Sequence, residues 1–277
     1  GKDSRFKKVD ENGKTGWPTI YALIRALQIE LGISNTVDNF GPGTQSLFLK
    51  RWPSGIFEQN KSDKTTSNVY SIIQGSLWCK GYSVGSGISQ NFYSGTGNAI
   101  KRLKADMGIE GNSTVTLDIM KSLLSMQQYV LLKHYGGTID VRNIQQKINR
   151  EYKNYTGIIP CDGLYGREMN KALIQILQSL EGYSPNDATG YFGNGTKSKL
   201  KTITSSNFSS YGKWVWLAKA TLNCLGYKCI QDNIWNSDFE NNLSKFQEDY
   251  KISVNKQLDI NTWMALLTSK GNPDRPA

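Results

Sequence analysis

Residues 23–44 read LIRALQIELGISNTVDNFGPGT, and residues 173–196 read LIQILQSLEGYSPNDATGYFGNGT. Both stretches begin with the pattern Leu-Ile-x-x-Leu-Gln, pass through a turn that contains glycine, and end in Phe-Gly-x-Gly-Thr. The second stretch is two residues longer, and the extra residues fall in its loop. A long pattern that occurs twice in one chain indicates an internal repeat, and a repeat constrains the fold more than any single motif does.

The two halves of the chain remain similar downstream of these stretches. The hexapeptide Leu77–Tyr82, LWCKGY, matches Leu222–Tyr227, LNCLGY. Two further pairs of segments correspond in the same order, namely 99–108 with 242–251 and 117–124 with 258–267. The sequence of 277 residues therefore predicts a duplication, with halves of roughly 140 to 150 residues each.

Each half is predicted to divide again into units of three helices. In the segment Val141–Tyr152, the residues Val141, Ile144 and Ile148 recur at the spacing of one helix face. Turns rich in Gly, Asn and Asp separate such segments, and continuous β alternation is hard to find, although short strand pairings in the loops remain possible. We expect an all-α fold of tandem three-helix modules arranged as a duplicated pair. The expected modules span residues 1–66, 67–138, 139–212 and 213–277.

The first module is expected to lack its opening helix. Asp10, Gly13 and Gly16 correspond to the loop 162–166 of the third module, where that loop follows the helix 141–152. No such helix precedes Asp10, so we expect exposed apolar surface on the remaining helices of the first module. Composition indicates linkers at 60–68, at 134–138 with its pair Gly136-Gly137, and at the Ser-rich segment 203–212.

Four motifs recur in order: a helix that ends in Gly-Tyr, an Asp-Gly-x-x-Gly loop, a helix with Leu-Gln or Phe-Gln, and a final Thr-Trp-x-x-Leu helix. The matching residues of the fourth module are Gly226-Tyr227, Lys245-Phe246-Gln247 and Asn261 to Leu267. Those of the third module are Ile144-Gln145-Gln146, Asp162 to Gly166 and Ala172 to Gln175. This combination resembles the three-helix peptidoglycan-binding domain family, and the resemblance covers nearly the whole chain as four modules.

Two modules depart from the family pattern. The second has Asn91 to Gly95, NFYSG, and the fourth has Asp232 to Asn236, DNIWN, where Asp-Gly-x-x-Gly is expected. Some modules are therefore expected to serve as spacers rather than to bind sugar.

The resemblance implies a non-catalytic protein whose partner is peptidoglycan, through its glycan strand or its stem peptide, and it implies no cofactor. The order of the modules and the ending Gly271 to Ala277 resemble the region that precedes a glycoside-hydrolase-like, lysozyme-like domain in proteins of Gram-positive bacteria and their phages. This likeness to endolysins implies an extracellular or cell-wall-associated protein that targets a C-terminal lytic domain to the wall. The sequence leaves the oligomeric state and the wall chemotype open.

A site for sugars and peptides needs aromatic faces that stack on pyranose rings, and amides or carboxylates that bind hydroxyl and N-acetyl groups. The glycine-rich loops supply both. The expected ligand-binding residues are Asp162, Tyr165, Tyr191, Asn194, Asn39, Tyr93 and Trp235. For the aromatic residues among them, a place in the core is the alternative. Phe40 and Phe192 in the same loops are assigned to the core, and Thr44 and Thr196 are interpreted as helix N-caps.

The formal net charge of +10 favours an anionic partner, such as nucleic acid, an acidic membrane or a wall with teichoic acids. Lys and Arg are spread along the whole chain, and no helix-turn-helix, zinc finger or basic helix stands out. A basic nucleic-acid-binding repeat protein is thus an alternative that the charge permits but no motif supports. No stretch is apolar enough to span a bilayer, so we expect no membrane partner.

The residue types in the sequence give little support to an enzymatic function. One histidine, His134, and four cysteines without a Cys-x-x-Cys pair do not form a recognisable zinc site. His134 is interpreted as a residue at a helix end. A glycosidase with a carboxylate pair in the loops remains an alternative, because the chain has 23 acidic residues. A disulfide between Cys224 and Cys229 is weighed against two small buried thiols, and the thiols are preferred.

Overall fold

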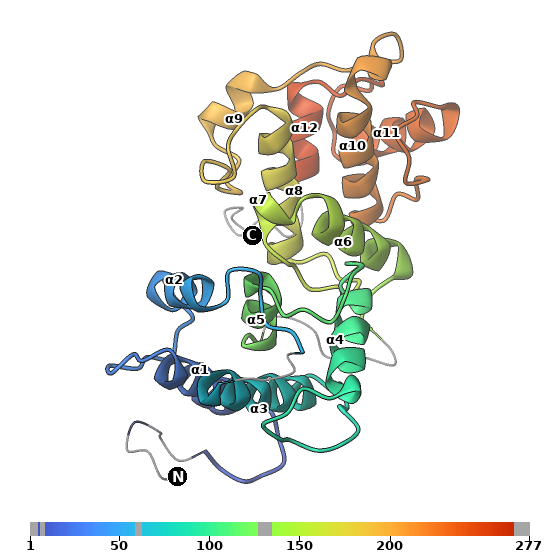
Figure 1. Ribbon diagram of the computed structural model, residues 1–277. Helices are drawn as coiled ribbons and strands as arrows, with labels where there is room; N and C mark the ends of the chain where they lie inside the picture. Colours follow the sequence, from blue (N-terminus) through green and yellow to red (C-terminus); the bar gives the residue numbers. More distant parts are fainter. Residues whose placement is uncertain (1–4, 6–8, 59–62, 127–134, 269–277) are drawn as a thin grey trace. The chain divides into compact units, whose positions relative to one another are not determined.

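The computed structural model describes residues 5, 9–58, 63–126 and 135–268. These residues form helices and loops without a strand or a sheet, so the predicted all-α class is confirmed (Figure 1). The extended contacts among them are two isolated antiparallel bridges, Ile56 with Val115 and Ile203 with Leu258. The chain divides into two compact units, residues 1–133 (unit 1) and 134–277 (unit 2). The finer division of each unit into two modules stays a prediction.

Unit 1 is organised around one central helix. Its helices are α1 (Trp17–Glu30), α2 (Pro42–Arg51), α3 (Lys64–Cys79), α4 (Ser94–Asp106) and α5 (Leu117–Leu123). The central helix α3 packs against α1, α4 and α5. It begins where the Asp63 side chain accepts a hydrogen bond from the Thr66 N–H at 3.0 Å, which satisfies a free amide of the first turn. The apolar side chains of Val69, Ile73 and Leu77, at helical spacing, are fully buried.

Unit 2 has one continuous core. Its elements are α6 (Ile139–Glu151), α7 (Lys153–Thr156), α8 (Arg167–Leu180), α9 (Asn194–Lys199), the 3-10 turn η1 (Phe208–Tyr211), α10 (Gly212–Cys224), α11 (Ser237–Asp249) and α12 (Ile260–Thr268). Helix α10 contacts α6, α8, α11 and α12, and every residue from Trp214 to Leu222 is buried. Buried residues from α6 to α12 belong to a single cluster. The segments predicted as the third and fourth modules therefore share one core.

The same buried glutamine contact fixes a loop in both units. Gln28, Gln74, Gln178 and Gln247 lie near the ends of α1, α3, α8 and α11, and each is almost completely buried. In each case Nε2 donates to a loop carbonyl and to a threonine hydroxyl, while Oε1 accepts a loop N–H. The threonines are Thr44, Thr96, Thr196 and Thr262.

This contact corrects the N-cap interpretation of Thr44 and Thr196. Helix α2 is capped by Gly41 and α9 by Gly193, without a side-chain hydrogen bond at either cap. The two threonines lie inside the first turns, and their hydroxyls accept hydrogen bonds from the buried glutamines at 3.2 and 3.1 Å. A buried amide needs partners, so these hydroxyls satisfy the glutamine rather than the helix end.

The segment around Gly136-Gly137 is not a linker. The Gly137 N–H donates to the Asp162 carbonyl at 3.0 Å, and the Thr138 N–H donates to the Gly163 carbonyl at 2.9 Å. The Ser-rich segment 203–212 is also structured, since Ile203 pairs with Leu258 and is fully buried. Composition suggested flexibility here because glycine and serine are common in linkers, but glycine also allows two backbones to approach closely.

Several other expectations have structural outcomes. All four cysteines are free thiols, so Cys224 and Cys229 do not form a disulfide. Phe192 is buried as predicted, whereas Phe40 is only half-buried. His134 lies outside the described residues. Among the residues with described positions, no helix is long and apolar enough to cross a membrane.

Candidate functional site

The loop 157–166 of unit 2 is held against α6 by two buried amide side chains. Asn149 brackets Ile159: its Oδ1 accepts from the Ile159 N–H at 2.8 Å and its Nδ2 donates to the Ile159 carbonyl at 3.0 Å. One turn earlier on α6, Gln145 accepts from the Gly163 N–H at 2.8 Å and donates to the Leu164 carbonyl at 3.1 Å. Because α6 supplies both amides, the loop has a fixed position relative to this helix.

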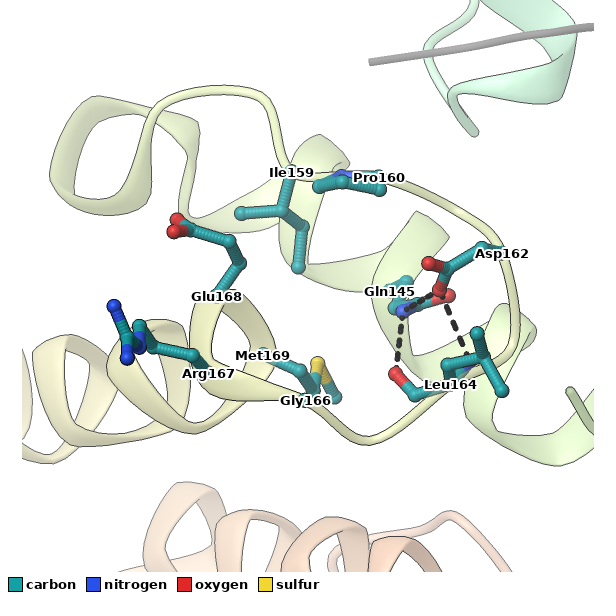
Figure 2. A pocket seen from close by; sticks show the side chains of 9 residues that line it. All are labelled: Gln145, Ile159, Pro160, Asp162, Leu164, Gly166, Arg167, Glu168 and Met169. Carbon is teal, nitrogen blue, oxygen red and sulfur yellow. Dashed lines mark hydrogen bonds between the residues drawn. The ribbon is translucent and has the colours of Figure 1, made fainter. Parts of the chain in front are cut away.

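Asp162 completes this arrangement and leaves one oxygen unused. Its Oδ1 accepts hydrogen bonds from Gln145 Nε2 at 2.9 Å and from the Leu164 N–H at 3.0 Å, as the dashed lines of Figure 2 show. Its Oδ2 has no hydrogen-bond partner among the described residues. Asp162 is half-buried, so this free oxygen is an acceptor at the protein surface.

A hollow of about 220 Å³, here called the Asp162 pocket, lies between this loop and the start of α8. Figure 2 shows Asp162 and Glu168 at opposite ends of it, with Ile159 and Pro160 between them. Its lining consists of Gln145, Ile159, Pro160, Asp162, Leu164, Gly166, Arg167, Glu168 and Met169. An apolar floor with carboxylates and a guanidinium at the rim suits a ligand that has both apolar groups and amides.

The start of α8 sets the charged part of this rim. Gly166 is the N-cap, and Arg167 and Glu168 are the first two residues of the helix, both exposed. A carboxylate at the first turn is favoured by the helix dipole. The rim can therefore donate hydrogen bonds from Arg167 and accept them at Glu168 and Asp162.

Of the predicted site residues, Asp162 and Tyr165 lie close to each other in this loop. Tyr165 is only half-buried, and it packs against the core of unit 2. Its hydroxyl accepts a hydrogen bond from Asn170 Nδ2 at 2.8 Å. Asn170 also donates to the Leu267 carbonyl at 3.0 Å. Tyr165 therefore anchors the loop, and its ring contributes to packing.

Tyr191 and Asn194 lie at the other end of α8. Gln178 holds the Tyr191 carbonyl at 3.0 Å, whereas Met169 lines the Asp162 pocket. These two positions are roughly 14 Å apart along the helix, at about 1.5 Å per residue. Tyr191 is 59% exposed. An aromatic ring that stacks on a sugar must be exposed, and Tyr191 meets this requirement. Asn194 is exposed as well. The two predicted groups do not form one pocket.

Trp235 is placed in the core. Its side chain is only 7% exposed, the ring packs edge-on against Phe239 at 4.8 Å between centroids, and Nε1 donates to Glu240 at 2.8 Å. Neither ring face is open to a sugar in this conformation. In unit 1, Asn39 is exposed and Tyr93 is 47% exposed, with its hydroxyl accepting from Asn91 at 3.0 Å.

Several residues of the Asp162 pocket were not predicted from the sequence. Gln145 was recognised only as part of a family motif, and Leu164, Arg167 and Glu168 were not singled out. A signal did exist: an Asp-Gly loop needs a partner for its carboxylate, and a polar residue on the buried face of the preceding helix is a natural partner. Gln145 lies one position after Ile144 on that face.

The described residues contain no group of three or more His, Cys, Asp or Glu side chains that could hold a metal ion.

A half-buried carboxyl of unit 2 with a strongly raised pKa lies outside the Asp162 pocket, at Glu181, immediately after α8. Both oxygens of Glu181 are buried without a hydrogen-bond partner in the described parts of the chain. Burial raises the pKa of Glu181 to about 7, while the charge of Lys199 acts in the opposite direction.

This carboxyl gives unit 2 a defined pH dependence. Because the folded pKa lies above the ordinary value of 4.5, the folded state binds the proton more tightly than the unfolded state does. Its contribution to stability is present below about pH 4.5 and is lost as the pH rises to about 7. We expect Glu181→Gln, which mimics the protonated form, to melt at a higher temperature than the unmodified chain at pH 8. The difference should shrink towards pH 5, and a difference independent of pH would contradict this assignment.

The comparisons with known proteins agree with this division of the chain. Residues 134–267 match the model of a peptidoglycan-binding-like domain, described as "FadG/YbfG, PGDB-like domain". The matched residues lie within unit 2 and contain the Asp162 pocket.

Two proteins of Bacillus subtilis (strain 168) are similar to 98% of the chain. The uncharacterized protein YbfG is 43% identical over 278 residues, and the uncharacterized protein FadG is 37% identical over 275 residues. The chain spans 36% of the length of the first and 46% of the length of the second. No solved structure matches the chain.

Proposed function

We propose that unit 2 is a non-catalytic domain that binds bacterial peptidoglycan, with the Asp162 pocket as its ligand site. The observation that carries this proposal is the match of residues 134–267 to a peptidoglycan-binding-like domain. The pocket supports it chemically, because stem peptides combine methyl groups with amides and carboxylates. An apolar floor beside Asp162, Arg167 and Glu168 provides contacts for each of these groups.

The wider setting belongs to the same proposal. The chain would act outside the cell or at the wall, and it would direct a lytic domain of a longer protein to its substrate. The relatives are longer than the chain, which leaves room in them for such a domain. The net charge of +10 would add a general attraction to anionic wall polymers.

The first test is sedimentation of the whole chain with insoluble Gram-positive peptidoglycan. We expect the chain to remain bound at about 0.3 M salt, where exposed charges are screened over roughly 6 Å. Release at this salt concentration would indicate charge attraction alone. Stronger retention on duplex DNA than on peptidoglycan would favour the nucleic-acid alternative, and loss of turbidity of the wall suspension would show that the chain is an enzyme.

The second test locates the site at the Asp162 pocket. Leu164 lines the pocket and is 49% exposed, while Leu49 on α2 of unit 1 is 45% exposed and serves as the matched control. Leu164→Ser should weaken wall binding about fivefold, the equivalent of about 1 kcal/mol of lost apolar contact. Leu49→Ser should leave binding unchanged, and neither variant should melt differently. Equal effects of the two substitutions would remove the pocket from the proposal.

A further inference from the structure

Tyr191 combines a large exposed fraction, 59%, with a fixed backbone position. Its carbonyl accepts a hydrogen bond from Gln178 Nε2 at 3.0 Å, and its N–H donates to the Thr189 hydroxyl at 3.2 Å. A Cβ at Gly193 would lie 3.1 Å from two carbons of the Tyr191 ring, so the ring lies against this glycine. The ring is therefore supported on one side, and its exposed part is held in place before any ligand binds.

The fold does not require an aromatic residue at position 191. A buried glutamine fixes three other loops through the same kind of contact, and the residues whose carbonyls accept from those glutamines are Asn39, Asn91 and Gln257. None of these three is aromatic, so an exposed ring is not needed to hold such a loop. An exposed aromatic ring in a fixed position is suited to stack on the apolar face of a sugar ring. Ligand binding therefore explains the tyrosine, whereas folding does not.

Gly190 brings the loop that carries this tyrosine onto α8, the helix whose start forms part of the Asp162 pocket. A Cβ at Gly190 would lie 2.4 Å from Lys171 Cγ and 3.1 Å from the Lys171 carbonyl oxygen, so the loop backbone lies directly against α8. Lys171 is exposed, and it follows Arg167 by four residues and Glu168 by three. Residues at these spacings are neighbours on the surface of a helix. The loop therefore contacts α8 about one turn from the charged rim of the pocket.

We propose that Tyr191 and the Asp162 pocket are two parts of one site for a muropeptide, with a sugar ring stacked on Tyr191 and the stem peptide in the pocket. The two parts are separated by roughly 14 Å along α8, and about four residues of extended peptide span the same length. Lys171 lies on α8 between them and can bind a carboxylate of the peptide. The inference rests on the proposed function, and it specifies that the ligand is the sugar joined to its peptide rather than the peptide alone.

The experiment measures, by NMR titration, the affinity of the whole chain for two soluble ligands. One is a stem tetrapeptide, and the other is the same peptide joined to its N-acetylated disaccharide. We expect the second ligand to bind about fivefold more tightly, the gain that one aromatic stacking contact provides. In a saturation-transfer experiment on the unmodified chain, saturation of the aromatic protons should also reach the ring protons of the sugar.

Three variants, none of which changes the net charge, locate the sugar contact. Tyr191→Asn removes the ring and places at this position the residue that the same contact holds in unit 1, at Asn39 and Asn91. It should bind both ligands equally, with the affinity of the unmodified chain for the free peptide. Tyr191→Phe should keep the fivefold preference, because stacking uses the ring and not the hydroxyl. Phe57→Asn, at a residue that is 43% exposed in unit 1, is the matched control and should also keep it.

The outcomes distinguish this inference from the proposed function. Equal binding of both ligands by the unmodified chain, or a preference that survives in Tyr191→Asn, overturns the sugar contact and leaves the peptide pocket intact. Loss of the preference in Tyr191→Phe or in Phe57→Asn also overturns it. Absence of saturation transfer to the sugar overturns the stacking contact without any variant, so a variant that does not fold cannot protect the inference. Failure of the chain to bind either ligand or the intact wall refutes the proposed function itself.

Discussion

Gly137→Ala is expected to destabilise unit 2 by about 3 kcal/mol, which lowers its melting temperature by roughly 10 °C. A Cβ at Gly137 would lie 1.8 Å from the Gly163 carbonyl oxygen and 2.0 Å from its carbon. These are backbone atoms, so no side-chain rotation can relieve the clash. The segment 135–138 would have to leave the loop, with loss of the hydrogen bonds to Asp162 and Gly163.

The adjacent glycine supplies a matched control. A Cβ at Gly136 would meet only Leu164 Cδ1, at the ordinary contact distance of 3.7 Å. Gly136→Ala should therefore leave the melting temperature within about 3 °C of the unmodified chain, because an unstrained Gly-to-Ala change alters stability by less than about 1 kcal/mol. Equal melting of the two variants would show that the segment is the flexible linker that its composition suggests.

Gln178→Leu should produce an effect of similar size through a different cause. Leucine keeps the approximate volume but removes hydrogen bonds to the Tyr191 carbonyl, the Thr196 hydroxyl and the Gly190 N–H, at 3.0, 3.1 and 2.9 Å. Each buried polar group left without a partner costs about 1–3 kcal/mol, and water entry will relieve part of that cost. We expect a loss of about 3 kcal/mol in the free energy of unfolding, measured by urea denaturation.

The control for this variant lies one turn earlier on the same helix. Gln175 is half-buried, and among the described residues its Nε2 donates to one acceptor, the Ala188 carbonyl, at 3.0 Å. Gln175→Leu should cost about 1 kcal/mol, as for one hydrogen bond. If Gln178→Leu is no more destabilising than Gln175→Leu, the buried glutamine is not what holds the loop 190–196.

Helical periodicity and turn composition were sufficient to predict the fold class. Runs such as Val141, Ile144 and Ile148 place apolar groups on one face, and that pattern depends only on local spacing. The repeat also pointed to the Leu-Gln positions, which became the buried glutamines 28 and 178. Their partners were misassigned, because a threonine near a helix start resembles an N-cap unless the tertiary partner of its hydroxyl is known.

The site was harder to predict, because burial and approach between distant segments decide it. Trp235 and Tyr191 occupy similar loops beside glycine or asparagine, yet one ring is buried and the other is 59% exposed. Gly137 follows another glycine, and such a Gly-Gly pair is typical of linkers, yet the backbone of Gly137 lies against Gly163. The clearest failure concerns Leu164, Arg167 and Glu168, whose side chains meet around one hollow only because Gln145 fixes the loop.

The burial of nine consecutive residues in α10 limits how this protein can be recombined. A crossover placed between residues 212 and 213, at the edge of the predicted third and fourth modules, would separate α10 from α6 and α8. The nine consecutive residues from Trp214 to Leu222 would then face water or a mismatched partner. Chimeras with exchanged single modules should aggregate, whereas exchange of residues 134–268 as one block keeps every such contact. For protein engineering, the smallest transferable part of unit 2 is therefore the third and fourth predicted modules together, and neither of them alone.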